Sequence, residues 1–267
     1  MYQTLVVDSA SSAEIAARNM HRFSINPTSK DPRQWFGGST DALELSLYSQ
    51  LGSAPINVVL ICHVDQDKDE RMGTFVRNPR LPGRLRAAMS GAYSEFYRMY
   101  ANFVQGQEGE VKRYFQTQTD PLYAAATRIK APNPCNPTYE ALWQNYLKKE
   151  RPFVHFLIYG EPGIGKSTFA AGCPTPIWVA MFDSFGKDVC YLDRGEPQPL
   201  EQQVIAESAG NKITVPARNV LDRDGNLLIR LEYFQDLNPF EPVAYARFSA
   251  RLTQVLKGVW DAVAPTN

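Results

Sequence analysis

One stretch of this chain constrains its fold more than any other. The mostly apolar run from Phe153 to Tyr159 leads directly into the segment "GEPGIGKST". This segment matches the pattern G-x-x-x-x-G-K-[ST], in which glycines let the backbone turn its N–H groups toward phosphate oxygens where a helix begins. The lysine supplies charge to the β- and γ-phosphates, and the serine supplies an oxygen to Mg²⁺. The sequence therefore predicts a phosphate loop for a nucleotide and Mg²⁺, formed by Gly160, Glu161, Pro162, Gly163, Ile164, Gly165, Lys166, Ser167 and Thr168.

The surrounding pattern alternates strands with helices, which is typical of an α/β fold with a mostly parallel central sheet flanked by helices. We expect a mobile polar loop over 65–84 and a small β-rich insertion near 203–235, with Asp224-Gly225 as its hairpin turn. The segment "INPTSKDPRQWFGGST" is also expected to be a loop. The other expected strands are 3–8, 56–64, 153–159, 176–183 and "EVKRYFQTQTD", and the expected helices are 11–22, 84–101, 138–149 and 242–263.

Composition excludes several classes of protein. The 267 residues include 28 Lys+Arg and 28 Asp+Glu, so any attraction to nucleic acid must come from a local patch. The apolar run 56–64 contains Asn57 and His63 and is too short to span a bilayer. Four cysteines far apart in sequence favour neither a zinc site nor a disulfide framework. We therefore expect a globular protein of a reducing, cytoplasmic compartment without membrane partners.

A phosphate loop also needs an acidic residue at the end of another strand to hold Mg²⁺. The segment "LVVDS" places Asp8 at the end of a short apolar strand near the start of the chain, where its carboxylate could hold the metal through water. Such an aspartate often serves only as a helix N-cap, so both interpretations fit the local sequence.

The order of the elements bears on this choice. Taken from 151 to 267 and then from 1 to 150, the chain becomes a phosphate loop, helix, strand, insertion, helix, Mg²⁺ strand, helix and a further strand. This circularly permuted order resembles the single-domain RecA-like ATPases of phages, a family with single-strand annealing activity that works beside phage recombination functions. The segments that carry the resemblance are "FLIYGEPGIGKSTFAAGCPTPIWVAMFD", "YLDRGEP", "AYARFSARL", "YQTLVVDSAS", "NVVLICHVDQDKDE", "LPGRL" and "RYFQTQTD".

The resemblance implies a single RecA-like ATPase domain over 1–267, with ATP and Mg²⁺ as its cofactors. The Mg²⁺ strand, a sensor strand and a DNA-binding loop would lie in 1–150, and the phosphate loop and the β-rich insertion near 203–235 in 151–267. A natural permutation and an engineered one both fit this order. The strand near 56–62 should lie between those near 3–8 and 153–159 in one parallel sheet. The family's role also implies single-stranded DNA, recombination or single-strand-binding proteins and further copies of the chain as partners, in the cytoplasm of a bacterial host.

Site residues follow from the same resemblance. His63, at a strand end, takes the position of a γ-phosphate sensor, although a buried histidine at a strand end commonly has only a structural role. Asp183 is the best candidate to orient the attacking water, or is a turn residue. Arg128 and Lys130 are candidates for a cation that reaches the nucleotide of a neighbouring subunit, or are simple surface charges.

The polar segment after His63 carries acids first and then a run of arginines. Such a run usually forms a solvated face, but beside a phosphate sensor it also suits a nucleotide-controlled contact with single-stranded DNA, with Phe75 stacking on a base. The candidate DNA-binding residues are Arg71, Phe75, Arg77, Arg80 and Arg84.

Two other functions share the phosphate loop. A small-molecule kinase would use the arginine run as a lid, and a nucleotide-binding assembly module would hold nucleotide without turning it over. The strand-ending His63 and the "VVDS" segment favour the RecA-like ATPase over the kinase.

Overall fold

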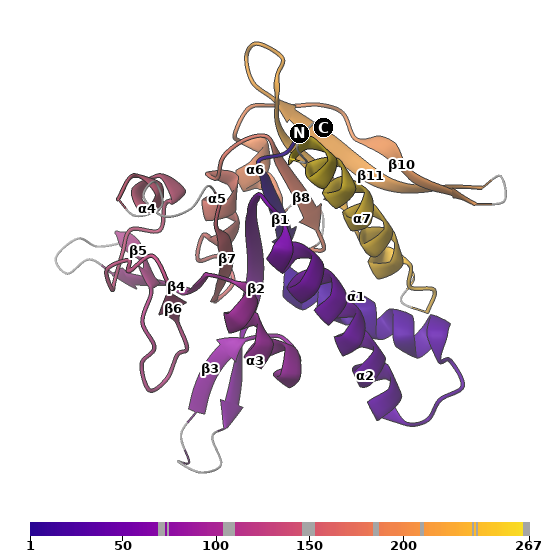
Figure 1. Ribbon diagram of the computed structural model, residues 1–267, viewed down its shortest axis with the longest axis horizontal. Coiled ribbons are helices and arrows are strands. Elements are labelled where there is room, and N and C mark those ends of the chain that lie inside the picture. Colours follow the sequence, from indigo (N-terminus) through magenta and orange to yellow (C-terminus); the bar gives the residue numbers. More distant parts are fainter. Residues whose placement is uncertain are drawn as a thin grey trace.

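The computed structural model describes residues 1–68, 73, 75–103, 110–145, 153–183, 187–208, 211–236, 238 and 240–263. A large sheet runs through the molecule, with helices on both faces (Figure 1). The strands are β1 (Thr4–Asp8), β2 (Asn57–Lys68), β3 (Phe75–Pro79), β4 (Glu95–Phe103), β5 (Val111–Gln116), β6 (Ala126–Thr127), β7 (His155–Gly160), β8 (Ile177–Met181), β9 (Glu196–Pro197), β10 (Glu201–Ser208), β11 (Asn211–Leu221) and β12 (Leu227–Tyr233). The helices are α1 (Ala10–Met20), α2 (Pro32–Leu43), α3 (Gly83–Ala92), α4 (Tyr139–Asn145), α5 (Lys166–Ala171), α6 (Val189–Leu192) and α7 (Ala244–Val263), with π-helical turns η1 (His21–Ile25) and η2 (Glu44–Gln50) and the 3₁₀ turn η3 (Leu51–Ser53).

The main path of the sheet has the order β10-β11-β12-β8-β1-β2-β7-β4-β5. Strands from both halves of the sequence are therefore part of one sheet, and β7 of the second half lies between β2 and β4 of the first. Its centre, from β12 to β4, is parallel. Its margins and the added strands β3, β6 and β9 are antiparallel. The sheet is therefore mixed, and the expectation of a mostly parallel sheet is correct only for the centre.

The relative placement of three strands is confirmed. β2 pairs in parallel with β1 on one side and with β7 on the other, so the strand near 56–62 lies between the other two. Because β1, β2 and β7 are parallel, Asp8, His63 and the phosphate loop all lie at the carboxyl edge of the sheet. This edge is where open α/β sheets bind ligands.

Buried side chains alternate between the two faces of these central strands, as the pleat requires. On β1, Leu5 and Val7 belong to the core beneath α1, α2 and α7, whereas Val6 belongs to the core beneath α5. In Figure 1 the α1, α2 and α7 helices cover one face, and α5 lies on the other. The strands are apolar on both faces because both faces are covered.

Several local predictions are confirmed. The β-rich segment appears as β10, β11 and β12, and Gly225 takes a φ of +81° in the turn that joins the last two. Such a φ favours glycine. The predicted 242–263 helix appears as α7.

Three local predictions are wrong. Within the expected loop 65–84, the described residues up to Lys68 extend β2, and Phe75–Pro79 form β3, which pairs with this extension in antiparallel fashion. Part of the expected loop "INPTSKDPRQWFGGST" belongs to α2, which begins after the N-cap Asp31. The expected helix 84–101 ends at Ala92, and β4 follows. Partners on both sides decide the β4 strand, since it pairs with β7 and with β5, and tertiary pairing outweighs local helix propensity.

Candidate functional site

The phosphate loop begins where β7 ends. A Cβ at Gly160 would collide with the carbonyl oxygen of Met99, so only glycine lets β4 pass this closely. Gly163 and Gly165 have φ values of +74° and +102°, which let the chain reverse and enter α5. The glycines of the motif therefore meet steric and conformational requirements of the loop.

The loop is held closed by its own lysine. The Lys166 ammonium donates hydrogen bonds to the carbonyl oxygens of Gly160 (3.0 Å) and Glu161 (2.8 Å). The side chain is buried, and this burial lowers its pKa, while the nearby Asp8 carboxylate acts in the opposite direction. The ammonium thus lies where an anion could take the place of the loop carbonyls.

Asp8 faces the loop from the end of β1. It is 4% exposed, and its carboxylate accepts hydrogen bonds from the hydroxyls of Ser167 and of Tyr191, the latter at 2.9 Å. Burial raises the pKa of Asp8 despite these hydrogen bonds and the Lys166 charge. Oxygen atoms of Asp8 and Ser167 therefore lie close together in the lining of the cavity. Oxygen is the ligand atom that Mg²⁺ prefers.

The alternative interpretation, in which Asp8 caps the following helix, does not hold. Ser9, not Asp8, is the N-cap of α1, and its side chain accepts a hydrogen bond from the Ser12 backbone N–H. The Asp8 carboxylate is thus directed into the cavity rather than onto the helix.

His63 was expected at a strand end, but it lies within β2, which continues to Lys68 and pairs with β3. It is instead the last residue of β2 that pairs with β7, and there its ring meets Asp183, which follows β8. His63 Nε2 lies 3.8 Å from Asp183 Oδ2 and 3.4 Å from Ser9 Oγ. The other carboxylate oxygen, Oδ1, accepts hydrogen bonds from Ser12 (2.6 Å) and Ser9 (3.2 Å). Burial lowers the pKa of His63, which favours the neutral ring. Its Nδ1 is buried with no hydrogen-bond partner among the described residues.

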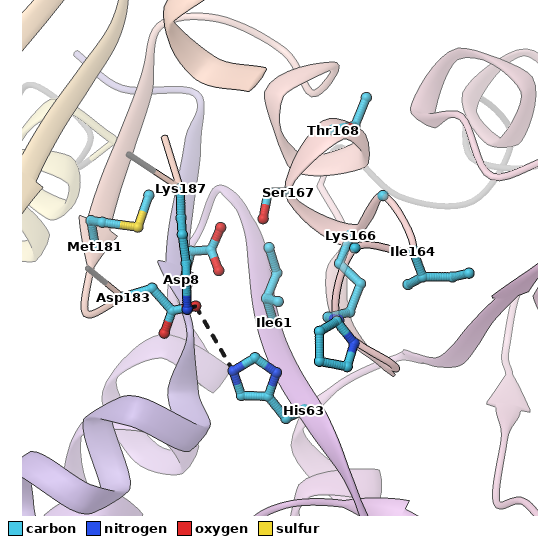
Figure 2. A pocket seen from close by; sticks show the side chains of 13 residues that line it. Asp8, Ile61, His63, Ile164, Lys166, Ser167, Thr168, Met181, Asp183 and Lys187 are labelled. Carbon is cyan, nitrogen blue, oxygen red and sulfur yellow. Dashed lines mark ion pairs between the residues drawn. The ribbon is translucent and has the colours of Figure 1, made fainter. Parts of the chain in front are cut away.

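These groups surround one cavity of about 370 Å³. Figure 2 shows Asp8 and Asp183 on one side and the phosphate loop with Lys166 on the other, with the His63–Asp183 pair dashed. Of the predicted residues, the cavity is lined by Asp8, His63, Pro162, Gly163, Ile164, Gly165, Lys166, Ser167, Thr168 and Asp183. Gly160 and Glu161 precede this lining and bind Lys166 through their carbonyls.

Other residues that line this cavity or contact its acids were not identified from the sequence. The Lys187 ammonium lies 3.6 Å from Asp183 Oδ2, and Tyr191 holds Asp8. Ser9 and Ser12 had a usable signal, because small hydroxyl residues directly follow the acid-ending strand in "VVDSASS". Tyr191 had none, since it approaches Asp8 only through the fold.

Arg128 and Lys130 do not line this cavity. The Arg128 backbone N–H donates to the carboxylate of Glu95 (3.3 Å), at the start of β4. The Arg128 guanidinium donates to the carbonyl oxygen of Gly91 (3.4 Å). The phosphate loop is at the opposite, carboxyl end of β7. A contact of either cation with nucleotide would therefore need another subunit, as the prediction states.

The predicted DNA-binding residues are dispersed over the β2–β3 hairpin and α3. Arg71 lies outside the described residues, and Phe75 is 52% exposed on β3. Arg77 donates to the Tyr123 hydroxyl, whereas Arg84 pairs with Asp41 (2.5 Å) and Glu44 (2.8 Å). The arginines are therefore not one continuous cationic surface, because part of their charge is matched by neighbouring acids.

Arg80 is linked directly to the cavity. Its backbone N–H donates to the His63 carbonyl (2.8 Å), and its own carbonyl accepts from the Ser11 hydroxyl (2.9 Å). Ser11 Oγ in turn accepts from the His63 backbone N–H (3.0 Å). One serine of α1 thus joins the sensor candidate to the base of the hairpin.

No family model, curated protein or solved structure matches this chain. The resemblance to phage RecA-like ATPases therefore stays a prediction. Over the part of the chain that the structure describes, no helix has the length and apolarity to cross a membrane. Nor do the described residues include a group of three or more His, Cys, Asp or Glu that could hold a metal by themselves. A metal at Asp8 and Ser167 would need further ligands, such as water or phosphate oxygens.

Proposed function

We propose that this protein binds ATP with Mg²⁺ and hydrolyses it, and that it acts on single-stranded DNA. One observation carries the proposal: the phosphate loop, Asp8, His63 and Asp183, which come from four strands, surround one cavity of about 370 Å³. A phosphate loop alone is common to many nucleotide-binding proteins. Its combination with the buried Asp8 carboxylate and with a second acid, Asp183, that is paired with His63 supports hydrolysis rather than binding alone.

The first part of the mechanism is binding of the phosphates. The Lys166 ammonium exchanges the loop carbonyls for phosphate oxygens, and the backbone of the loop follows the phosphate chain. Asp8 and Ser167 would hold Mg²⁺, which would supply positive charge to neutralise the phosphates. The Asp8 carboxylate fits this role, because a buried ionised acid is stabilised by a nearby cation.

The second part is attack by water. Asp183 Oδ1 is held by Ser9 and Ser12, which fixes the carboxylate and leaves Oδ2 toward His63 and Lys187. From there Asp183 orients the attacking water toward the γ-phosphate. His63 stays neutral and contacts the phosphate with a ring nitrogen, so it responds to the presence of the γ-phosphate.

The third part is transmission to DNA. The Ser11 link couples any shift of the His63 backbone to Arg80 at the base of the β2–β3 hairpin. Phe75 and Arg77 on β3, together with Arg80, then contact bases and phosphates of a single strand. Arg84 contributes less, because two carboxylates already neutralise it.

The sheet order supports the RecA-like resemblance. The strands β7, β2, β1 and β8 are neighbours in this order across the sheet. The circularly permuted arrangement implies the same order for β7, β2 and β1, with the sensor strand β2 in the middle. On this basis we propose one RecA-like domain that works in phage recombination or annealing. Other copies of the chain would be its partners, with Arg128 or Lys130 reaching the nucleotide of a neighbour.

The decisive experiment is phosphate release from Mg²⁺-ATP with and without single-stranded DNA. We expect release that requires Mg²⁺ and rises when the DNA is added. Tight ATP binding without turnover in either condition would instead favour a nucleotide-binding assembly module. Transfer of phosphate to a small acceptor, with no response to DNA, would favour a kinase.

A further inference from the structure

A second cavity, of about 450 Å³, lies beside the phosphate loop. It shares Gly165 and Thr168 with the first cavity, so the two meet at the start of α5. Its volume is within the roughly 300–1,000 Å³ typical of small-molecule sites. The proposed function places triphosphate in the first cavity but assigns nothing to the second.

Two residues of this lining, Met99 and Arg113, come from β4 and β5. The pairing of β4 with β7 ends at Arg98 opposite Tyr159, and the rest of β4 continues past the phosphate loop. β5 pairs with this extension and places Arg113 opposite Ala101. A Cβ at Gly165 would lie 3.2 Å from Arg113 Cδ, so the Arg113 side chain lies against the loop itself.

The lining carries groups suited to a nucleoside. Arg113 and Arg194 approach from β5 and from the end of α6, and among the described residues neither guanidinium has a side-chain hydrogen bond or ion pair. The lining also includes Thr138, Tyr139, Glu140, Phe169 and Gly172, and the buried Tyr139 hydroxyl donates to Asn57 Oδ1 (3.3 Å). Guanidinium planes stack on aromatic rings, and the Thr138 hydroxyl and Glu140 carboxylate have oxygens of the kind that pair with ribose hydroxyls and base amino groups.

We propose that this second cavity binds the base and ribose of the nucleotide whose phosphates occupy the phosphate loop, with Arg113 stacked on the base. The inference rests on the proposed nucleotide binding and adds where the nucleoside lies and which residue selects for it. A chain of phosphates that runs from Lys166 past Thr168 emerges at the boundary of the two cavities. The nucleoside then enters the second cavity without any change in the fold.

The test compares ATP with inorganic tripolyphosphate, which has the phosphates but no nucleoside. Dissociation constants for both are measured with Mg²⁺ by calorimetry, for the wild type, Arg113→Ala and Arg113→Lys. Lys112→Ala is the matched control, because Lys112 neighbours Arg113 on β5 but does not line the cavity. Arg113 is exposed on an edge strand, so its replacement should leave the fold intact, which circular dichroism checks.

We expect the wild type to bind ATP at least about tenfold more tightly than tripolyphosphate, a difference of about 1.4 kcal/mol. Arg113→Ala should remove most of this preference by weakening ATP alone, and Lys112→Ala should not. Arg113→Lys should behave like Arg113→Ala, since a lysine keeps the charge but not the stacking plane.

Equal weakening of both ligands by Arg113→Ala, or full recovery with Arg113→Lys, would make Arg113 a phosphate-binding cation and overturn the nucleoside assignment. Equal affinity of the wild type for both ligands would overturn it as well. In these cases the phosphate loop would still bind its ligand. Failure of the wild type to bind either ligand would instead remove the proposed nucleotide binding, and this inference with it.

Discussion

The fold brings candidate site residues together at the carboxyl edge of the central sheet but separates them around the β2–β3 hairpin. At the sheet edge, residues from distant parts of the chain converge: Asp8, His63, Lys166 and Asp183 line one cavity. At the hairpin and α3, arginines close in sequence separate, and Arg84 joins Asp41 and Glu44 while Arg77 joins Tyr123. A position at the end of a parallel strand therefore says more about a site than a run of charge does, because parallel pairing brings strand ends together and surface charges find local partners.

The largest expected effect tests the sheet edge. Lys166→Ala should lower the rate of ATP hydrolysis on the order of 10²-fold or more, because it removes a positive charge aimed at the transferred phosphate. Lys212→Ala, an exposed lysine on β11, is the control and should leave the rate unchanged. Phosphate release under saturating Mg²⁺-ATP measures both. An active Lys166→Ala protein would mean that the cavity is not the hydrolytic site.

Asp8→Asn separates function from stability at the same edge. Hydrolysis should fall on the order of tenfold or more and respond less to Mg²⁺, since a neutral amide is a weaker metal ligand than a carboxylate. The melting temperature without nucleotide should rise at pH 7. Burial raises the pKa of Asp8 above 3.8, so the folded protein bears a cost for ionising it that is absent below 3.8 and complete above the folded-state pKa.

The melting temperature gain from Asp8→Asn should therefore shrink as the pH is lowered toward 3.8. Calorimetric scans across this range measure it. A variant less stable than the wild type at pH 7 would indicate that the hydrogen bonds from Ser167 and Tyr191 outweigh the burial cost.

The hairpin is tested by salt dependence. Arg77→Ala with Arg80→Ala should weaken binding of single-stranded DNA and reduce the slope of log affinity against log salt by about 1.4, which is roughly 0.7 for each phosphate that an arginine no longer neutralises. Arg84→Ala is the matched comparison and should change the slope little, because its charge is already paired. Fluorescence titrations between roughly 50 and 200 mM salt, the range over which phosphate neutralisation strongly affects affinity, measure both. An equal effect of Arg84→Ala on the slope would instead indicate that Arg77, Arg80 and Arg84 act as one cationic surface.

The smallest expected effect concerns pH and His63. Burial lowers its pKa below 6.5, so below 6.5 the unfolded chain binds a proton that the folded protein does not. The free energy of unfolding should therefore fall as the pH decreases from 6.5 toward the folded-state pKa, and His63→Gln should reduce that fall. Urea unfolding at several pH values for both proteins gives the difference. Identical pH profiles would assign the acid sensitivity to other groups.

Local chemistry in the sequence determined several features of this protein. The glycines and lysine of the phosphate loop, the acid that ends β1, the Gly225 turn and the amphipathic pattern of α7 all depend on residues that are neighbours in the chain. Their conformational requirements can therefore be recognised without a partner.

Tertiary structure alone decided the rest. β4 is a strand, not a helix, because β7 and β5 supply hydrogen-bonding partners on both sides. Tyr191 reaches Asp8, and Arg113 reaches Gly165, only because the sheet brings together segments more than fifty residues apart. The arginines that form one run in the sequence were divided in the same way, by acids and aromatic rings from other elements. Contacts of this kind depend on which strands pair, and in this chain pairing between distant strands outweighs what local sequence favours.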